Sequence, residues 1–214
     1  WPTMLAVASD RYPRTGAVAI SIMGGIGMLS AGIVGGPGLG YAKDRFSGEA
    51  LQASDAENNS TVYETAKADS DSTFLFFADS TGIDGKQIGA IQGKLGTARA
   101  ILEKGKVKDF DETSVEGMTD EEKEKARQTF SEKKEIEQAL VSAKALTIGT
   151  PGKPEDATKI LSSGETAIHA ASIEGDRRTL RADSFIPGTM AVIYFFIFLY
   201  FRSQGGYKIV KFDD

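Results

Sequence analysis

The chain has 214 residues, of which 41% are hydrophobic and 26% charged, as in an average globular protein. It has no cysteine, which excludes disulfides, thiol catalysis and cysteine-bound zinc, and its one histidine, His169, excludes a multi-histidine metal site. The formal net charge of −5 argues against a nucleic-acid partner, because phosphate binding needs a basic face. We therefore expect no metal, no cofactor and no nucleic acid.

The charges are distributed very unevenly. Asp, Glu, Lys and Arg are absent between Thr15 and Ala42 and again between Ser184 and Phe201. Residues 43–183 hold 20 of the 25 basic and 27 of the 30 acidic residues, a net charge of −7. This layout predicts an all-α membrane protein with two complete transmembrane helices, the end of a third, and a mainly helical insertion. We do not expect an enzyme.

The first complete transmembrane helix is predicted over residues 16–41. A hydrocarbon core about 30 Å thick needs roughly 20 helical residues, and this segment is long enough. Its many glycines would each cost about 1 kcal/mol against alanine in a soluble helix, but lipid and neighbouring helices tolerate them. A phosphate-binding loop is excluded, because the segment has neither the Gly-x-Gly-x-x-Gly spacing nor a following Lys-Ser/Thr.

Two short segments precede this helix. Residues 1–9 are apolar but short, and they are predicted to be the end of a truncated transmembrane helix. Residues 10–15 are predicted to form a short polar turn that carries Asp10, Arg11 and Arg14. The first residue is Trp rather than Met, so we expect the chain to be part of a longer protein.

The second complete transmembrane helix is predicted over residues 184–201, followed by a tail over residues 202–214 on the same side of the membrane as the turn at residues 10–15. Aromatic residues crowd its second half, and Arg202 can extend its charge to the membrane surface. Pro187 is predicted to lie near the start of the helix, where its missing backbone donor costs little.

Small residues recur four apart in the first transmembrane helix. Ala17, Ser21 and Gly25 form one such set, and Gly32, Gly36 and Gly40 form another. A spacing of four puts each set on one helical face, and small-residue faces let membrane helices approach closely. We therefore predict a helix-packing role for Gly25, Gly32, Gly36 and Gly40, with further helices of the same polypeptide as partners. Pro37 is predicted to break or bend the helix.

The insertion, residues 42–183, has several helical patterns. Apolar residues recur at helical spacing between Gly85 and Leu102, and a Thr119-x-x-Glu122 capping box begins a charged helix. That second helix has its apolar side at Ala126, Phe130, Leu140 and Val141. Pro154 suits a helix start near residues 155–161, and residues 166–180 are predicted to continue toward the second transmembrane helix.

The insertion also contains an apolar run, a single histidine and two acidic clusters. The apolar run at residues 73–77 is predicted either to dock on the membrane helices or to form a strand. His169 lies in the run TAIHAAS without a visible nucleophile partner, so we interpret it as a packed or solvated side chain. The acidic clusters at residues 109–112 and 120–122 lack the spacing of a calcium loop and are interpreted as solvated.

Two stretches resemble the C-terminal helices of major facilitator superfamily transporters. The run PTMLAVASDRYPRTGAVAISIMGGIGMLSAGIVGGPGLGY is similar to the tenth-to-eleventh helix region, and SFIPGTMAVIYFFIFLYFRSQGGYK is similar to the twelfth helix and tail. Within the first, Gly32-x-x-x-Gly36-Pro37-x-x-Gly40 resembles the glycine–proline motif of the fifth helix, the symmetry mate of the eleventh. The insertion is a departure, since family members usually have a short connection there.

The resemblance implies a secondary active transporter that moves a small solute by alternating access. It also implies a multi-pass protein of the plasma (inner) membrane, with residues 10–15 and 202–214 in the cytoplasm and residues 42–183 outside. The basic residues near the membrane do not decide the orientation, since five lie on each side. The alternative is a two-span receptor or sensor with an extracytoplasmic ligand-binding domain. The substrate cannot be predicted from the sequence.

Overall fold

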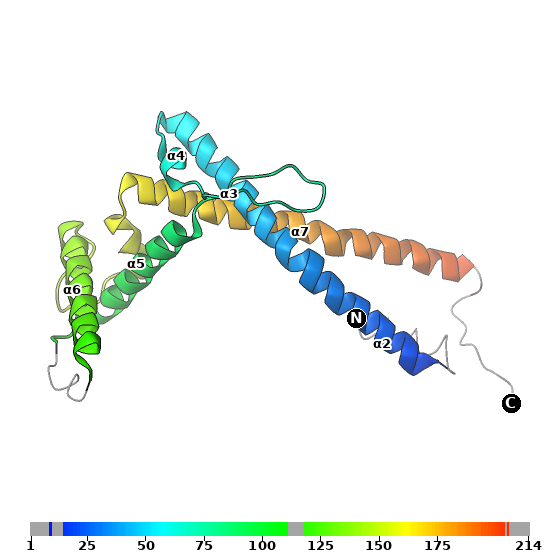
Figure 1. Cartoon of the computed structure of the whole chain (residues 1–214), viewed down its shortest axis with the longest axis horizontal. Coiled ribbons are helices and arrows are strands. Elements are labelled where there is room, and N and C mark those ends of the chain that lie inside the picture. The colour runs from blue at the N-terminus through cyan, green and yellow to red at the C-terminus, as the bar shows by residue number, and fades with distance from the viewer. Residues whose placement is uncertain (1–8, 10–14, 111–117, 204, 206–214) are drawn as a thin grey trace. The chain divides into compact units, whose positions relative to one another are not determined.

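The computed structural model describes residues 9, 15–110, 118–203 and 205, and this part of the chain is helical (Figure 1). It contains no named strand, only three isolated β-bridges. An all-α fold is therefore confirmed for the described residues. The elements are α2 (Gly16–Leu29), the π-helical η1 (Ser30–Gly35), α3 (Gly36–Asn58), α4 (Val62–Ala66), α5 (Gly85–Lys104), α6 (Asp120–Ser142), the 3₁₀ helix η3 (Pro154–Ile160) and α7 (Ser163–Ser203).

The chain divides into two compact units. Unit 1 comprises the described residues within 1–47, 70–82 and 174–214, and unit 2 comprises those within 48–69 and 83–173. Helices α3 and α7 each contribute to both units, so the apolar helices continue without interruption into the polar region. Some predicted features lie outside the described residues: the Asp10–Arg14 turn with Arg11, and most of segments 1–9 and 202–214.

Helices α2, η1 and α3 follow one another directly. Of the two effects predicted for Pro37, a break or a bend, the break is therefore wrong. Instead, a turn of π-helix over Ser30–Gly35 lies just before the proline, and the Gly36 amide donates to the carbonyl of Ala31. A proline inside a helix clashes with the carbonyl four residues back and leaves it without a donor. The wider π-turn accommodates this defect without ending the helix.

Helix α7 begins at Ser163, about twenty residues before the predicted second transmembrane segment. Pro187 therefore lies inside a helix rather than near its start, and the prediction was wrong on this point. The reason is a capping box at Ser162 and Glu165, which begins the helix within the polar region. The prediction that residues 166–180 continue into the apolar segment is confirmed.

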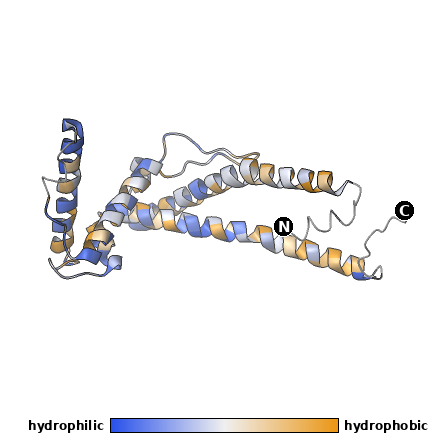
Figure 2. Cartoon of the chain, turned by 90° about the horizontal axis from the view of Figure 1, so that it is seen from below, coloured by the Kyte–Doolittle hydropathy of each residue, from blue (hydrophilic) through white to orange (hydrophobic). Residues whose placement is uncertain are grey.

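Two helices, Gly16–Asn58 and Ser163–Ser203, are long and apolar enough to cross a membrane. Within the most apolar part of each, no described residue is buried, and large side chains such as Met28 (81% exposed) and Phe185 (71%) are open to the surroundings. Figure 2 shows the hydrophobic colour concentrated on α2 and on the C-terminal part of α7. Such large exposed apolar surfaces indicate helices that pack against lipid or other apolar helices.

Unit 2 has its own hydrophobic core. Its largest fully buried apolar side chains are Leu51 on α3, Leu102 on α5 and Leu140 on α6. The predicted helix over residues 85–102 is confirmed as α5, and its side chains at Ile91, Leu95, Ala98 and Leu102 are buried. The core shows that the polar region is a folded domain and not a linker.

Helix α6 begins with the predicted capping box at Thr119 and Glu122. Phe130 packs against the core and Leu140 is fully buried, as predicted. Val141 is 39% exposed, so it was wrongly assigned to the apolar side, because it lies one position beyond Leu140 and therefore on the next helical face. The segment after Pro154 is helical as predicted but forms the 3₁₀ helix η3.

Candidate functional site

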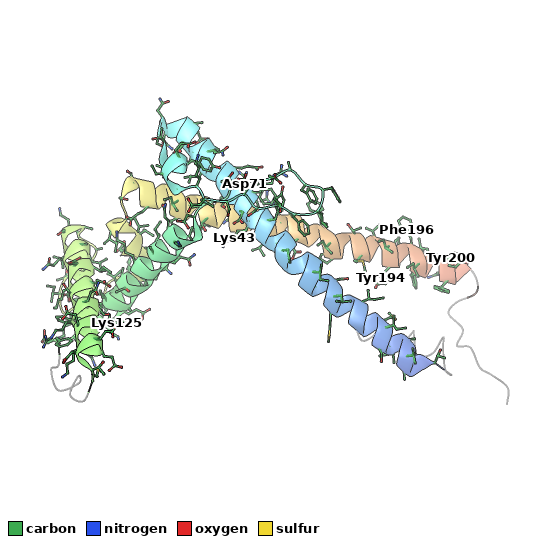
Figure 3. All side chains as sticks on the ribbon, viewed as in Figure 1. Lys43, Asp71, Lys125, Tyr194, Phe196 and Tyr200 are labelled. Atoms are coloured by element: carbon green, nitrogen blue, oxygen red, sulfur yellow. The ribbon has the colours of Figure 1, made fainter. Side chains whose placement is uncertain are left out.

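The crossing of α3 and α7 in unit 1 is the best-defined structural feature near the apolar segments. A Cβ atom built on Gly175 would lie 2.8 Å from both the Cβ and the backbone nitrogen of Ser47. Only glycine therefore permits this approach of the two helices. Beside the crossing, Lys43 Nζ and Asp176 Oδ1 lie 3.0 Å apart. Figure 3 places Lys43 close to this point on the ribbon.

A hairpin-like loop, residues 70–82, packs against the first turns of α3. The backbones of Ser72 and Ser80 exchange two hydrogen bonds of 2.8 and 3.1 Å, which close the loop. The Ser72 hydroxyl donates to the carboxylate of Asp44, and a Cβ on Gly82 would lie 2.7 Å from the Asp44 Cβ. Both ends of the loop are therefore held at Asp44. We call residues 70–82 the hairpin.

The predicted apolar run at residues 73–77 forms the tip of this hairpin. It is a turn rather than a strand, closed by a hydrogen bond from the Phe77 amide to the Phe74 carbonyl. The rings of Phe74 and Phe77 lie 6.1 and 5.9 Å from the ring of Tyr41, whose hydroxyl donates to the carbonyl of Ala78 at 2.6 Å. These two rings therefore pack against α3, and the strand alternative is wrong.

A cleft of about 390 Å³ lies beneath the hairpin. It is formed by parts of unit 1, and most of its lining is apolar. The lining residues are Gly35, Gly38, Leu39, Tyr41, Ala42, Arg45, Phe46, Phe74, Phe77, Thr179, Ala182, Asp183 and Ile186. Arg45 and Asp183 add one charge of each sign, so the cleft suits an amphipathic group rather than a fully polar one.

The glycines predicted to pack against other helices lie on open surface. Cβ atoms built on Gly25, Gly32, Gly36 and Gly40 would meet no atom within 4 Å in the described part of the chain. Pro37 is likewise exposed. Their packing role is therefore a proposal that depends on further helices.

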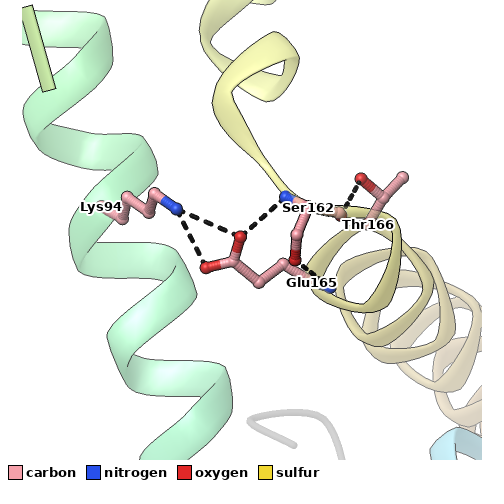
Figure 4. Close-up of polar contacts among 4 residues, drawn as sticks. All are labelled: Lys94, Ser162, Glu165 and Thr166. Carbon is pink, nitrogen blue, oxygen red and sulfur yellow. Dashed lines mark hydrogen bonds and ion pairs between the residues drawn. The ribbon is translucent and has the colours of Figure 1, made fainter. Parts of the chain in front are cut away.

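The start of α7 is held by a polar network in unit 2 (Figure 4). Glu165 accepts from the backbone amide of Ser162 at 2.8 Å and from Lys94 Nζ at 3.0 and 3.1 Å. Burial raises the pKa of Glu165, but the bonds from Ser162 and Lys94 outweigh it and hold that pKa below its usual value. The network joins α5 to the first turn of α7. Its sequence signal, Ser162-x-x-Glu165, is a capping box that our sequence analysis missed.

A second carboxylate, Glu137, is buried on α6 with a side chain only 6% exposed. It accepts from the backbone amide of Val107 at 2.6 Å and from Lys134 Nζ at 2.9 Å. Burial raises the pKa of Glu137, and the bonds from Val107 and Lys134 lower it by more. The arrangement fixes the loop after α5 against α6 and is structural.

Unit 2 also contains a cleft of about 710 Å³ between α5, α6 and the loop that follows α5. Ile101, Phe110 and Phe130 supply apolar surface there. The cationic side chains that line it are Lys104, Lys106, Lys108 and Lys133, with Asp109 as the one acidic lining residue. A cleft of this kind favours an anionic ligand with an apolar part.

The remaining sequence candidates are not brought together into a site. His169 is half-buried on α7, in line with its interpretation as a packed side chain. Across the described residues, which exclude Asp111 and Glu112, no group of three or more acidic or histidine side chains could hold a metal ion.

No protein-family model matches the chain, and no curated protein or solved structure matches it either. The functional argument therefore rests on the residues and on the geometry described above.

Proposed function

We propose that this chain is part of a secondary active transporter that moves a small solute across the plasma (inner) membrane by alternating access. It would supply the last helices of a multi-pass bundle, with residues 42–183 as an extracytoplasmic domain. In this proposal the chain's partners are the lipid bilayer, further helices of the same polypeptide, and a small solute.

The observation that carries the proposal is the open glycine-rich face of the helix formed by α2, η1 and α3. Lipid chains do not drive helices together by the hydrophobic effect, so close packing of small residues takes that role. Gly25, Gly36 and Gly40 offer such contacts but meet no neighbour in the described chain. A two-span protein would leave this face unused, whereas a transporter bundle would cover it.

The π-turn adds support for a moving helix. Its wider backbone ring lies directly before Pro37, in the middle of the first apolar segment. Such turns are frequent at functional sites, and irregular backbone in transporter helices marks places where a helix bends between states. The described spans contain no Asp, Glu, Lys or Arg between Gly16 and Ala42, so the coupling chemistry would come from other helices.

A two-span receptor or sensor is the second candidate, and the lysine-lined cleft of unit 2 favours it. A folded domain with its own core and a lysine-lined cleft is what an extracytoplasmic detector of anionic ligands needs. The receptor differs from the transporter in one consequence: its ligand would bind without any solute crossing the membrane.

Gly36→Leu tests the proposal in the intact protein. We expect this variant to lose solute uptake, because a leucine on the packing face would keep a neighbouring helix away. Uptake is measured in proteoliposomes with a panel of radiolabelled sugars, amino acids and organic acids, at equal amounts of inserted protein. Gly27→Leu is the matched control, since Gly27 belongs to neither set of small residues spaced four apart.

Two results would count against the transporter. Uptake by Gly36→Leu equal to that of Gly27→Leu would remove the packing argument. Binding of a panel solute with no transmembrane flux in the unmodified protein would favour the receptor.

A further inference from the structure

The tip of the hairpin exposes two large apolar side chains. Phe74 packs onto Tyr41 and Phe77, 45% exposed, lies between Tyr41 and Phe76, whereas Leu75 is 72% and Phe76 is 86% exposed. Large apolar side chains such as these stabilise a structure when they leave water. Two adjacent ones held outward in a closed turn therefore indicate a surface that meets an apolar medium.

The backbone of the tip strengthens this point. Leu75 has a φ of +52°, in the left-handed region that glycine or asparagine adopts much more easily. A turn exposed to water would ordinarily have one of those residues here. The leucine at this position keeps an apolar side chain at the tip despite the strained backbone.

The hairpin also reaches back along α3 toward the apolar segment. Its base is held at Asp44, while at its tip the Phe74 ring lies against Gly38, with 3.0 Å between the ring and a Cβ built on that glycine. Six residues of helix separate Asp44 from Gly38, a rise of about 9 Å. The tip is therefore level with the last turn of the predicted span over residues 16–41.

We infer that Leu75 and Phe76 insert into the lipid bilayer at its interface with water, where the hairpin anchors the first turns of α3. This inference rests on the proposed membrane location. Aromatic side chains are enriched at this depth, because a ring fits the boundary between headgroups and acyl chains. The apolar surface of the tip then continues that of the two helices instead of forming an isolated patch.

Tryptophan fluorescence tests the depth of the tip. The chain has one tryptophan, Trp1, so a Trp1→Phe background leaves each introduced tryptophan as the only reporter. Phe76→Trp reports the tip, Ile26→Trp the middle of the first apolar segment, and Lys125→Trp an exposed position on α6. The proteins are reconstituted in phosphatidylcholine vesicles with bromine atoms placed either near the headgroup or near the end of the acyl chain.

We expect Phe76→Trp to lose most of its emission with the shallow bromines and to resist quenching by aqueous iodide. Ile26→Trp should respond most to the deep bromines, and Lys125→Trp only to iodide. Since the Phe76 ring is exposed, a tryptophan there should not disturb folding. As a second measurement, a nitroxide on Phe76→Cys should be accessible to oxygen and protected from a water-soluble nickel chelate.

The outcomes separate this inference from the proposed function. Iodide quenching of Phe76→Trp, with normal lipid quenching of Ile26→Trp, would overturn the hairpin anchor and leave the membrane helices in place. Protection of Phe76→Trp from both quenchers would also overturn it, because a protein surface would then cover the tip. If Ile26→Trp is not quenched by lipid either, the membrane location itself is wrong.

Discussion

At the scale of single residues, the buried Glu137 shows how a charge can stabilise a small domain. Its carboxylate satisfies the Val107 amide and pairs with Lys134, so removing it would leave a buried backbone donor without a partner. Sequence patterns could not reveal this role, because Val107 lies on a different segment, 30 residues away. Glutamate is rarely buried in proteins, so its residue type alone does not indicate this position either.

Glu137→Ala should therefore destabilise the protein by about 2–3 kcal/mol, the cost of a lost charged hydrogen bond and an unpaired donor. Chemical denaturation monitored by circular dichroism measures the loss. Glu135→Ala is the matched control, since Glu135 is exposed on the same helix; we expect a change below about 0.5 kcal/mol there. Equal effects of the two substitutions would show that the contact to Val107 contributes nothing.

The same carboxylate gives the stability a pH dependence. Because folding lowers the pKa of Glu137, its contribution is complete above the unfolded value near 4.5 and is lost as the pH falls below it toward the folded value. Glu165 acts in the same direction, since its pKa is also lowered. The substitution Glu137→Ala should thus cost less at pH 3 than at pH 7.

At the scale of elements, much of the helical structure follows from local sequence. The spacing of Ile91, Leu95 and Leu102 predicts α5, and the capping box at Thr119 predicts the start of α6. What could not be predicted are the features set by tertiary contacts. The inward direction of Phe74 depends on space above Gly38, and the early start of α7 places Pro187 inside a helix.

The crossing of α3 and α7 depends on one glycine. Gly175→Ala would place a methyl group 2.8 Å from Ser47, so one helix must move, at a cost of about 1–3 kcal/mol. Gly164→Ala is the matched control on the same helix, because its nearest neighbour would be Val62 at an ordinary 3.8 Å. It should be neutral or slightly stabilising.

Thermal unfolding in detergent compares the two variants. We expect a lower Tm for Gly175→Ala and an unchanged or higher Tm for Gly164→Ala. If Gly175→Ala is as stable as the control, the close approach of the helices is not required for the fold.

At the scale of the whole molecule, the apolar helices and the polar domain follow from the same charge pattern. The stretches without charge correspond to exposed parts of α2, α3 and α7, and the acidic region forms a domain with its own core. The candidate site was only partly predictable from the sequence. The docking of residues 73–77 was one of two predicted alternatives. The cleft beneath them was not predictable, because it is lined by two helices that are distant in sequence. The glycine face was predicted, and its partners remain part of the proposal.

The central claim is that the two apolar helices cross a membrane and place residues 42–183 outside the cell. This chain has no cysteine, so single-cysteine variants need only a background in which the rest of the intact protein is also free of cysteine. In the intact protein, Lys125→Cys should react with a membrane-impermeant maleimide on intact cells, and Ser203→Cys only after permeabilisation. Labelling of both cysteines from the same side of the membrane would contradict the account.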